Sequence, residues 1–537
     1  MGRWQRYWFA DGGRLSVAVV RIAIAVAVGM SLWRLATLST VQLPPVPEVY
    51  RPVGVWMVTG EWVPTADVVL VLWIVAWVGT AAMLLGLCTR VATVVSFVGA
   101  MSLAALSYAG SAAWSHQYNV VFLAQLAFFG ARGGDALSVD AVIRRVRGLP
   151  PKDVPHGYQW SLRLVQLAIA LMFAGAAFHK LLHGHFTLRW ALSDNLRHHL
   201  LVRYDLAGIE RPPLVDWLLE DVWRYRTAAL LNLLAQATPL LAMFFMRRPV
   251  LRALCGAVFA LEILGLGLVV SLWNEHWLPL VAAFIDWDRL FRRTHEEDRA
   301  PGFRPPLAPR IYIAAFLVYE GVTSFVPSLD QRLNTYPFSG FPMFATIRAL
   351  EPYDEHLPYS VPGDRFVVAS DAPLTEVQQR WFDHANRGVY NLKSQAQLEP
   401  KLRAILATAR TRYGDGIRGL RHQVALFEAE PYPAPARFDE YPIAVTGELL
   451  ADGTFRSLLG TLADGAIELR ATHVDASRIE RLVYYADDRP IRWELAFTRE
   501  GDRLVLASPL KPDPVYVVAF VDGTPWLVAQ RRSWKWQ

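Results

Sequence analysis

Charged residues and cysteine are scarce in this sequence. Only 19% of the 537 residues are charged, whereas 53% are hydrophobic and 20 are tryptophan. This balance is unusual for a soluble globular protein and typical of a membrane protein with a soluble part. The two cysteines, Cys88 and Cys255, lie in strongly apolar segments, which argues against a disulfide framework.

Several catalytic and binding signatures are also absent. The sequence contains no phosphate-binding glycine loop, nucleophile elbow, paired catalytic carboxylates or HExxH zinc motif. Its net charge of +6 does not indicate nucleic-acid binding, because Lys and Arg concentrate in short connections between apolar runs, where they act as topology signals. We therefore expect neither a nucleic-acid partner nor a bound metal.

Long apolar runs dominate the first two thirds of the chain. Runs long enough to cross a membrane as helices lie at about 15–37, 67–87, 91–110, 117–132, 160–182, 225–246, 250–273 and 309–327. A shorter ninth run is HWLPLVAAFIDW at 276–287. The first run continues to Trp33 without a small-residue cleavage site, which predicts a membrane helix rather than a removed signal peptide.

Basic residues are concentrated in alternate connections between these runs. Segments 132–152, 247–252 and 289–310 are rich in arginine, whereas 39–65 and 108–117 hold almost no basic residues. With nine spans, the positive-inside rule places the N-terminus in the cytoplasm and the C-terminal third outside a multi-pass cell-membrane protein. With eight spans the C-terminal third would lie inside, so the short ninth run decides the topology.

The character of the sequence changes near Leu329. Two stretches, EVQQRWFDHANRG and LEPKLRAILATARTRYG, are typical of helices. The stretches typical of strands are RFVVAS, HQVALFEAE, YPIAVTGELL, AIELRATHV, IRWELAFT, RLVLAS and VYVVAF. The sequence thus predicts an α-helical polytopic membrane bundle of about nine spans in residues 1–328, followed by an α+β, strand-rich extramembrane domain in residues 329–537.

Lys180 lies at the outer end of the fifth apolar run, in the stretch FAGAAFHKLLHG. One interpretation is an anchoring lysine whose ammonium group reaches the membrane interface, and the local pattern favours it. In the other interpretation the side chain points into the bundle, where desolvation disfavours the ammonium form and makes the lysine a usable general base. The burial of Lys180 decides between the two.

Four histidines lie near the same membrane leaflet. His179 and His183 have the i, i+4 spacing that places two imidazoles on one helix face, and His185 follows. Because metal binding needs a third or fourth ligand, the pattern favours interfacial histidines. His116 begins the fourth run, and in the nine-span topology it shares a leaflet with Lys180, so the two groups can line one outward-facing pocket.

Other polar residues interrupt the apolar runs. Glu262 lies within the seventh run, where a carboxylate is costly and usually faces the bundle interior with a partner. A packing role and a place in the Lys180 pocket both remain open for Glu262. Arg21 and Gln166 are predicted to form hydrogen bonds between helices, and Gln166 and His179 are further candidates for lining the pocket.

Four stretches carry a resemblance to a known family. LLGLCTRVATVVSF, WSHQYN, ALSVDAV and LRLVQLAIALMFAGAAFHKL resemble, in the same order and at similar spacing, the membrane region of vitamin K-dependent γ-carboxylase. They also resemble bacterial proteins that share its horizontally transferred transmembrane (HTTM) domain. The resemblance covers residues 14–345. It implies that Lys180 is the base that deprotonates reduced vitamin K, a menaquinol-type quinol, and that His116 is its companion.

In that family, O2 converts the deprotonated quinol to a strongly basic alkoxide, which removes a proton from the γ-carbon of a glutamate so that CO2 can add. The resemblance therefore implies a carbon-carbon lyase and monooxygenase activity on a protein or peptide glutamyl substrate at the extracytoplasmic side. Such a base survives only where water is excluded, as within a helical bundle. The alternative is a non-enzymatic membrane scaffold, or a lipid- or quinone-binding protein, that presents its soluble domain to a partner. The scaffold predicts a lipid-facing Lys180.

The sequence departs from the family pattern near the lysine and elsewhere. The first tryptophan after Lys180 is Trp190, which is further along the chain than the family pattern places it. His179 stands where the animal enzyme has a second lysine, and Glu262 lies near where that enzyme has a functional histidine. The C-terminal domain is also shorter than that of the animal enzyme.

Overall fold

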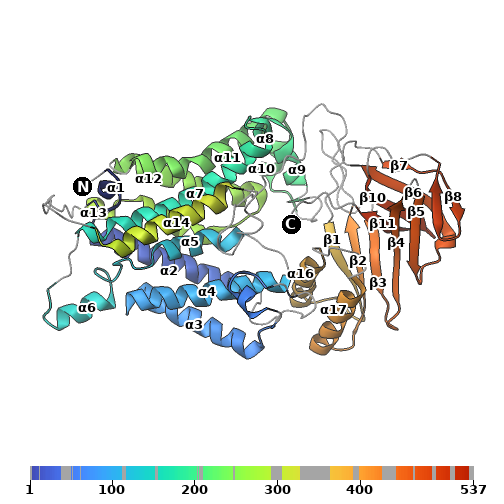
Figure 1. Ribbon diagram of the computed structural model, residues 1–537, viewed down its shortest axis with the longest axis horizontal. Helices are drawn as coiled ribbons and strands as arrows, with labels where there is room; N and C mark the ends of the chain where they lie inside the picture. Colours follow the sequence, from blue (N-terminus) through green and yellow to red (C-terminus); the bar gives the residue numbers. More distant parts are fainter. Residues whose placement is uncertain are drawn as a thin grey trace.

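A computed structural model gives the arrangement of helices and strands along the chain (Figure 1). It describes residues 3–10, 12–37, 50, 52–60, 62–111, 116–150, 155–201, 203–204, 210–245, 248–291, 305–326, 363–390, 398–425, 443–463, 466–486, 492–507 and 514–530. The expected domain boundary at 328/329 and the end of the family resemblance at residue 345 lie outside these residues.

Helices form the N-terminal half. The long ones are α2 (Arg14–Thr37), α3 (Ala66–Leu85), α4 (Thr89–Ser111), α7 (Gln159–His183), α11 (Val222–Ala242), α12 (Pro249–Val270) and α14 (Leu307–Phe325). The short ones are α1 (Arg3–Trp8), α5 (Asn119–Ala127), α6 (Val139–Val146), α8 (Arg189–Leu192), α9 (Asn195–Leu201), α10 (Pro213–Leu219) and α13 (Trp287–Leu290). Among the described residues, six helices are long and apolar enough to cross a membrane, namely α2, α3, α4, α7, α11 and α12. Each coincides with an expected apolar run to within about one helical turn.

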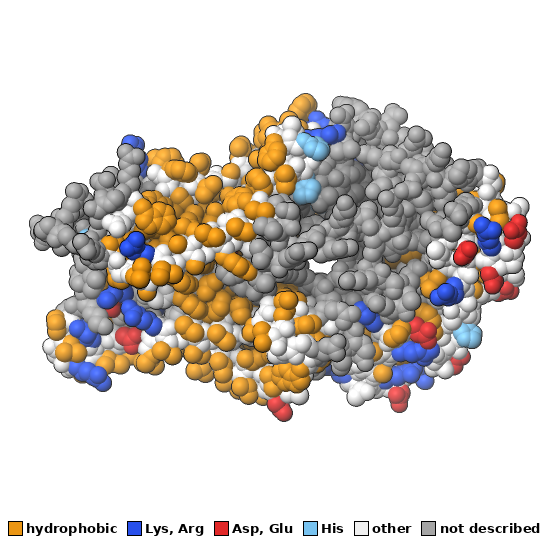
Figure 2. All heavy atoms as spheres, viewed as in Figure 1, with side chains coloured by type: hydrophobic (Ala, Val, Ile, Leu, Met, Phe, Trp, Pro, Cys, Tyr) orange, Lys and Arg blue, Asp and Glu red, His pale blue; other side chains and the backbone are white. Residues whose placement is uncertain are grey.

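The helical half exposes an apolar surface (Figure 2). On α3, the side chains of Val71, Ile74 and Val78 are 59%, 48% and 63% exposed. Large apolar patches of this kind mark contact with a partner or with a membrane. The surface is therefore compatible with a helical bundle that lies in lipid.

Two expected spans are shorter than a regular membrane helix. Run 117–132 forms the 3-10 turn η3 (His116–Tyr118) followed by α5, which is 9 residues long. Run 276–287 forms the 3-10 helix η7 (Glu275–Phe284), which contains Pro279. Proline has no backbone N–H to donate and clashes with the preceding α-helical turn, which is a physical reason for η7 not to form an α-helix.

The 3-10 helix η7 nevertheless runs antiparallel to α2. Arg34 near the end of α2 forms an ion pair with Glu275 at the start of η7, with 3.4 Å between the charged atoms. Ser16 near the start of α2 donates to Asp288, just beyond the end of η7, at 2.6 Å. A 3-10 helix rises about 2 Å per residue and an α-helix about 1.5 Å, so the 10 residues of η7 follow little more than half the length of the 24-residue α2.

Arg21 joins α2 to several connections at the other end of the bundle. Its side chain is 0% exposed and donates to the carbonyl oxygens of Gly133 (2.7 Å), Leu137 (2.6 Å) and Leu84 (3.3 Å). The prediction that Arg21 forms hydrogen bonds between helices is confirmed.

The C-terminal part is rich in strands. Its helices are α16 (Glu376–Tyr390) and α17 (Leu398–Tyr413). Its strands are β1 (Gly363–Ser370), β2 (Ile417–Ala425), β3 (Ile443–Leu449), β4 (Phe455–Ala463), β5 (Ala466–Thr472), β6 (Ile479–Ala486), β7 (Arg492–Glu494), β8 (Phe497–Glu500), β9 (Arg503–Leu506), β10 (Pro514–Val521) and β11 (Thr524–Gln530). A helix-rich half followed by a strand-rich domain with two helices is confirmed.

The strands pair in the order β7-β6-β10-β11-β3-β4-β5-β9-β8, and β2 joins β3 to β1. The described pairs are antiparallel except β11 with β3, which is parallel. One core lies between α16, α17 and β1 to β3 and contains Phe366, Phe382 and Leu402. In Figure 1 this domain lies beyond one end of the helical bundle, with α16 beside α4 and with α8, α9 and α10 at the same end.

Candidate functional site

Lys180 lies in the last turn of α7 and is only 2% exposed. A lysine that anchors the chain at the membrane interface keeps its ammonium group in water. The buried position of Lys180 therefore contradicts the anchoring interpretation, and it contradicts the lipid-facing lysine that the scaffold hypothesis predicts. The side chain points into the bundle.

Two amide side chains of α11 bind the Lys180 ammonium group. Its Nζ donates to Asn232 Oδ1 at 2.6 Å and to Gln236 Oε1 at 2.9 Å. The same two amides donate to one oxygen of Glu262 on α12, from Asn232 Nδ2 at 2.6 Å and from Gln236 Nε2 at 3.0 Å. Glu262 is 6% exposed and Gln236 is 1% exposed. Lys180 and Glu262 thus belong to one buried polar network. In it, each amide accepts a hydrogen bond from the lysine and donates one to the glutamate.

An aromatic ring covers the same ammonium group. Lys180 Nζ lies 4.2 Å from the centre of the Trp190 ring, within the range of a cation-π contact. Trp190 is 2% exposed and belongs to α8, the helix that follows α7. Trp190 lies later in the sequence than the tryptophan of the family pattern, but it still contacts Lys180.

His179 faces a different helix from its neighbour Lys180. Its Nε2 donates to the carbonyl oxygen of Ser324 on α14 at 3.1 Å, and its own carbonyl oxygen accepts from His183 Nδ1 at 2.7 Å. His179 is 2% exposed, whereas His183 and His185 are exposed. The interfacial interpretation thus fits the last two histidines but not His179, whose buried ring links α7 to α14.

His116 begins η3 and is half-buried. It lies within electrostatic range of His179, the residue that precedes Lys180. The polar groups of η3 and of the end of α7 therefore belong to the same region of the bundle.

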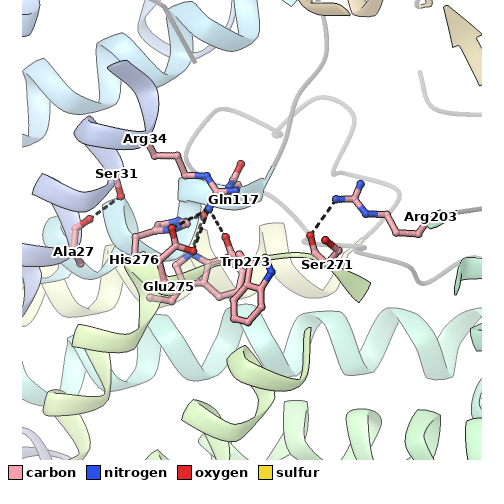
Figure 3. Close-up of polar contacts among 10 residues, drawn as sticks. Ala27, Ser31, Arg34, Gln117, Arg203, Ser271, Trp273, Glu275 and His276 are labelled. Atoms are coloured by element: carbon pink, nitrogen blue, oxygen red, sulfur yellow. Dashed lines mark hydrogen bonds and ion pairs between the residues drawn. The ribbon is translucent and has the colours of Figure 1, made fainter. Parts of the chain in front are cut away.

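A cluster of polar and aromatic residues that the sequence did not reveal surrounds η3. The carbonyl oxygen of Gln117 accepts from His276 Nε2 at 2.9 Å and from Trp277 Nε1 at 2.7 Å, as Figure 3 shows for His276. Tyr118 packs against His276 with 5.3 Å between ring centres. His276 Nδ1 and the Tyr118 hydroxyl are buried without a hydrogen-bond partner among the described residues. Such orphaned atoms are suited to bind a polar group of a ligand.

Glu320 on α14 is a second buried carboxyl group that the sequence did not reveal. It is 0% exposed, and within the described part of the chain neither of its side-chain oxygens has a hydrogen-bond partner. Ser324, one turn later on α14, provides the carbonyl oxygen for His179. Ionisable groups buried in a membrane bundle are functional candidates, so Glu320 joins the candidates near His179.

Gln166 lies apart from these residues. It precedes Lys180 on α7 by about four turns, or roughly 21 Å along the helix, and its Nε2 donates to the carbonyl oxygen of Ala283 at 2.5 Å. The predicted hydrogen bond between helices is confirmed for Gln166. Its place in the Lys180 pocket is not, because of this separation along α7.

One pocket of about 480 Å³ opens at the end of α2 and is lined by Gly29, Met30, Trp33, Arg34 and Glu275. Figure 3 shows Arg34 and Glu275 beside His276 and Gln117, so this pocket adjoins the cluster of polar and aromatic residues around η3. Among the described residues, no three His, Cys, Asp or Glu side chains are placed to hold a metal ion together.

A second pocket, of about 260 Å³, lies in the strand-rich domain, where β3 meets β4 and β11. Its lining includes Glu448, which accepts from Arg421 at 2.6 Å and from Arg456 at 3.2 Å. The arginine side chains are therefore engaged by a carboxylate of the chain itself.

No family model, no curated protein and no solved structure shows a significant match to this chain. The resemblance to the γ-carboxylase and HTTM proteins is therefore carried by the four sequence stretches alone.

Proposed function

We propose that the chain crosses the cell membrane nine times, through α2, α3, α4, α5, α7, α11, α12, η7 and α14. The antiparallel contacts of η7 with α2 support η7 as the short eighth crossing. An odd number of crossings places the two termini on opposite sides. In Figure 1, α1 and the arginine-rich α6 lie at the end of the bundle opposite the strand-rich domain. By the positive-inside rule the N-terminus is cytoplasmic and the strand-rich domain is extracytoplasmic.

Cysteine labelling in intact cells tests this topology. In a chain with Cys88 and Cys255 replaced by serine, Asp452→Cys in the strand-rich domain should react with a membrane-impermeant maleimide. Arg147→Cys beside α6 should react only after the cells are opened. Both positions are exposed, so the opposite pattern would reverse the orientation, and equal labelling of both in intact cells would contradict an odd number of crossings between the two positions.

We further propose that the protein is a quinol-dependent enzyme of the γ-carboxylase type, with Lys180 as the base. The observation that carries this proposal is the burial of Lys180 in a network with Glu262, away from lipid and water. The co-substrates are a menaquinol-type reduced vitamin K, O2 and CO2. The quinol, when bound, supplies the acidic hydroxyl and the reactivity towards O2.

The residues of the chain would bind and orient this quinol and exclude water. As a neutral amine, Lys180 would take the hydroxyl proton at Nζ and become the ammonium group, while Asn232 and Gln236 fix the position of that nitrogen. His116, His276 and the Tyr118 hydroxyl supply polar groups at the same end of the bundle, and the orphaned atoms of the last two fit a ligand with hydroxyl or carbonyl oxygens. A dry, preorganised site is what a strongly basic intermediate requires.

The substrate that we propose is a glutamyl side chain of a protein or peptide on the extracytoplasmic side. Support comes from the strand-rich domain, which lies at the end of the bundle where α7 leads into α8 and α9 (Figure 1). A polypeptide held by this domain would have its side chains next to the end of α7, where Lys180 lies.

The test uses the full-length protein in lipid nanodiscs with reduced vitamin K or menaquinol, O2 and labelled bicarbonate. Mass spectrometry measures the quinone epoxide, and label in a glutamate-containing peptide measures carboxylation. Lys180→Ala should reduce epoxide formation at least 100-fold. The matched control is Lys401→Ala, which removes a buried lysine (6% exposed) from the other domain. Unchanged turnover in Lys180→Ala would refute Lys180 as the base.

A quinone- or lipid-binding role without turnover is the second candidate function. The observation that favours it is the pocket of about 480 Å³ at the end of α2, which opens beside the exposed Trp33. In the same nanodiscs, saturable quinone binding without any epoxide would support this second function over the first.

A further inference from the structure

Each N–H donor of the Lys180 ammonium group has a partner in the surrounding structure. An ammonium group has three N–H donors. Asn232 and Gln236 accept two of them, at 2.6 Å and 2.9 Å. The face of the Trp190 indole, with its centre 4.2 Å from Nζ, is left for the third. A ligand that interacts with this nitrogen must therefore take the place of one of the three.

The two amides are held firmly in place. Asn232 and Gln236 lie on the long helix α11, and each also donates to Glu262. If either amide group turned away from Lys180, it would also lose its bond to the buried carboxylate. Leaving a buried charged group without a partner costs several kcal/mol, which argues against displacement of either amide.

Trp190 is held differently. It belongs to α8, a helix of 4 residues, and the side chains of residues 185–189 that precede it are exposed. His185 and Phe186 have positive φ angles of 54° and 58°, a conformation that costs about 1 kcal/mol or more in residues with a Cβ. The segment that carries Trp190 is therefore short, exposed and strained, whereas the indole itself is buried.

The far end of this segment is tied to α11. The Ser193 hydroxyl donates to the carbonyl oxygen of Trp190 at 3.3 Å. Asp194 accepts a hydrogen bond from Tyr225 and forms an ion pair with Arg226 at 3.9 Å. These contacts keep α8 at the end of the bundle. The connection between α7 and α8 is strained at His185 and Phe186, although its backbone is hydrogen-bonded to the last turn of α7.

We propose that Trp190 is a displaceable cap and that the planar ring of a ligand binds over Lys180 in the place of the indole. The ligand class is an aromatic or quinoid ring with an oxygen substituent, because the ring replaces the contact of the indole and the oxygen meets the third position of Nζ. The identification of this ligand as a quinol rests on the proposed function. The cap itself depends only on the contacts of Trp190.

Chemical labelling of Lys180 tests the cap without any assay of turnover. The full-length protein in nanodiscs is treated with a small membrane-permeant activated ester, and mass spectrometry follows acylation of Lys180. Trp190→Ala should speed acylation at least tenfold, whereas Trp190→Phe, which keeps a ring, should stay within threefold of the unmodified protein. The matched control is Trp217→Ala, because the Trp217 ring lies 4.7 Å from Arg224 and is 49% exposed; it should leave the rate unchanged.

Acylation of Trp190→Ala within twofold of the unmodified protein would overturn the cap. If Trp190→Ala lowers the melting temperature strongly, Trp190→Met takes its place, because methionine fills much of the volume without an aromatic face. Equal acylation of Trp190→Met and the unmodified protein would then overturn the proposal.

Binding of menaquinone with a short side chain tests the displacement. Because the ligand no longer has to expel the indole, Trp190→Ala should bind it at least as tightly as the unmodified protein, and bound ligand should protect Lys180 from acylation in both. Binding weakened tenfold in Trp190→Ala would mean that the indole is a wall of the site and would overturn displacement. Absence of binding to both proteins, with fast acylation in Trp190→Ala, would refute the quinol and leave the cap intact.

Discussion

The Lys180 ammonium group and the Glu262 carboxylate are bridged by two amide side chains, each of which accepts from the lysine and donates to the glutamate. An amide can serve both partners in this way only when its oxygen faces the cation and its nitrogen faces the anion. The bridge therefore fixes the orientation of Asn232 and Gln236 and keeps two buried charges compensated across the width of one side chain.

This arrangement predicts that the two charges depend on each other. Lys180→Met should lower the free energy of unfolding by about 3 kcal/mol, because it leaves the Glu262 carboxylate uncompensated in the bundle. Glu262→Gln should lower the free energy of unfolding by a similar amount, because it leaves the Lys180 ammonium group uncompensated. The double variant should be more stable than the sum of the single changes predicts, as measured by thermal unfolding in detergent. Strictly additive losses would show that the two groups are energetically independent.

The sequence predicted the long helices well and the site only in part. Apolar run 160–182 became α7 (Gln159–His183), because length and hydrophobicity suffice to define a membrane helix. Asn232 and Gln236 were not predicted as site residues, although polar residues four apart within an apolar run lie on one helix face. Their contact with Lys180 depends on how α7 and α11 pack, which the pattern of either helix alone does not contain.

In the strand-rich domain, too, local sequence patterns missed structure that depends on contacts between distant parts of the chain. The unexpected strands are β4 (Phe455–Ala463), β6 (Ile479–Ala486) and β11 (Thr524–Gln530), and the stretch IRWELAFT divides into β7 and β8. Strand β11 contains Pro525, which argues locally against a strand. Its residues pair with both β10 and β3, so contacts with residues distant in the sequence override the local preference.

Arg21 gives a prediction for the opposite end of the bundle. Arg21→Met should lower the free energy of unfolding by about 3 kcal/mol, because it removes a buried charged donor from several carbonyl oxygens, including those of Gly133 and Leu137. The comparison is Arg224→Met, which removes a partly exposed ion pair with Glu220 and should cost less than about 1 kcal/mol. Thermal unfolding in detergent measures both, and equal losses would contradict the role of Arg21 as a clamp.

The contact between α3 and α4 depends on two glycines. A Cβ atom on Gly79 would lie 2.6 Å from the backbone nitrogen of Ser96, and one on Gly99 would lie 2.8 Å from the Cα atom of Ala76. Because backbone cannot move aside as a side chain can, Gly79→Ala and Gly99→Ala should each cost about 1–3 kcal/mol.

The control for these glycines is Gly265 on α12, where an added Cβ would meet nothing within 4 Å. Gly265→Ala should be neutral or stabilise the protein by about 1 kcal/mol through its helix propensity. Melting temperatures of the three variants in the same detergent provide the measurement. A loss in Gly265→Ala as large as in Gly99→Ala would mean that close approach of the helices is not the cause.

His422 makes the stability of the strand-rich domain depend on pH. Its imidazole lies between β2 and β3, where Nδ1 pairs with the Thr446 hydroxyl, and burial lowers its pKa from 6.5 to about 3. Below pH 6.5 the unfolded chain binds a proton at this position that the folded domain does not bind. The free energy of unfolding should therefore be highest above pH 6.5 and fall by about 1.4 kcal/mol per pH unit as the pH decreases towards 3.

Hydrogen exchange of β2 and β3 in the full-length protein, corrected for the intrinsic effect of pH on exchange, measures this slope between pH 6.5 and 5. In that window the loss attributable to His422 should be about 2 kcal/mol. His422→Gln removes the titrating group and keeps a polar side chain that can pair with Thr446, so its slope should be smaller by that amount. An identical slope in His422→Gln and the unmodified protein would show that other groups control the pH dependence.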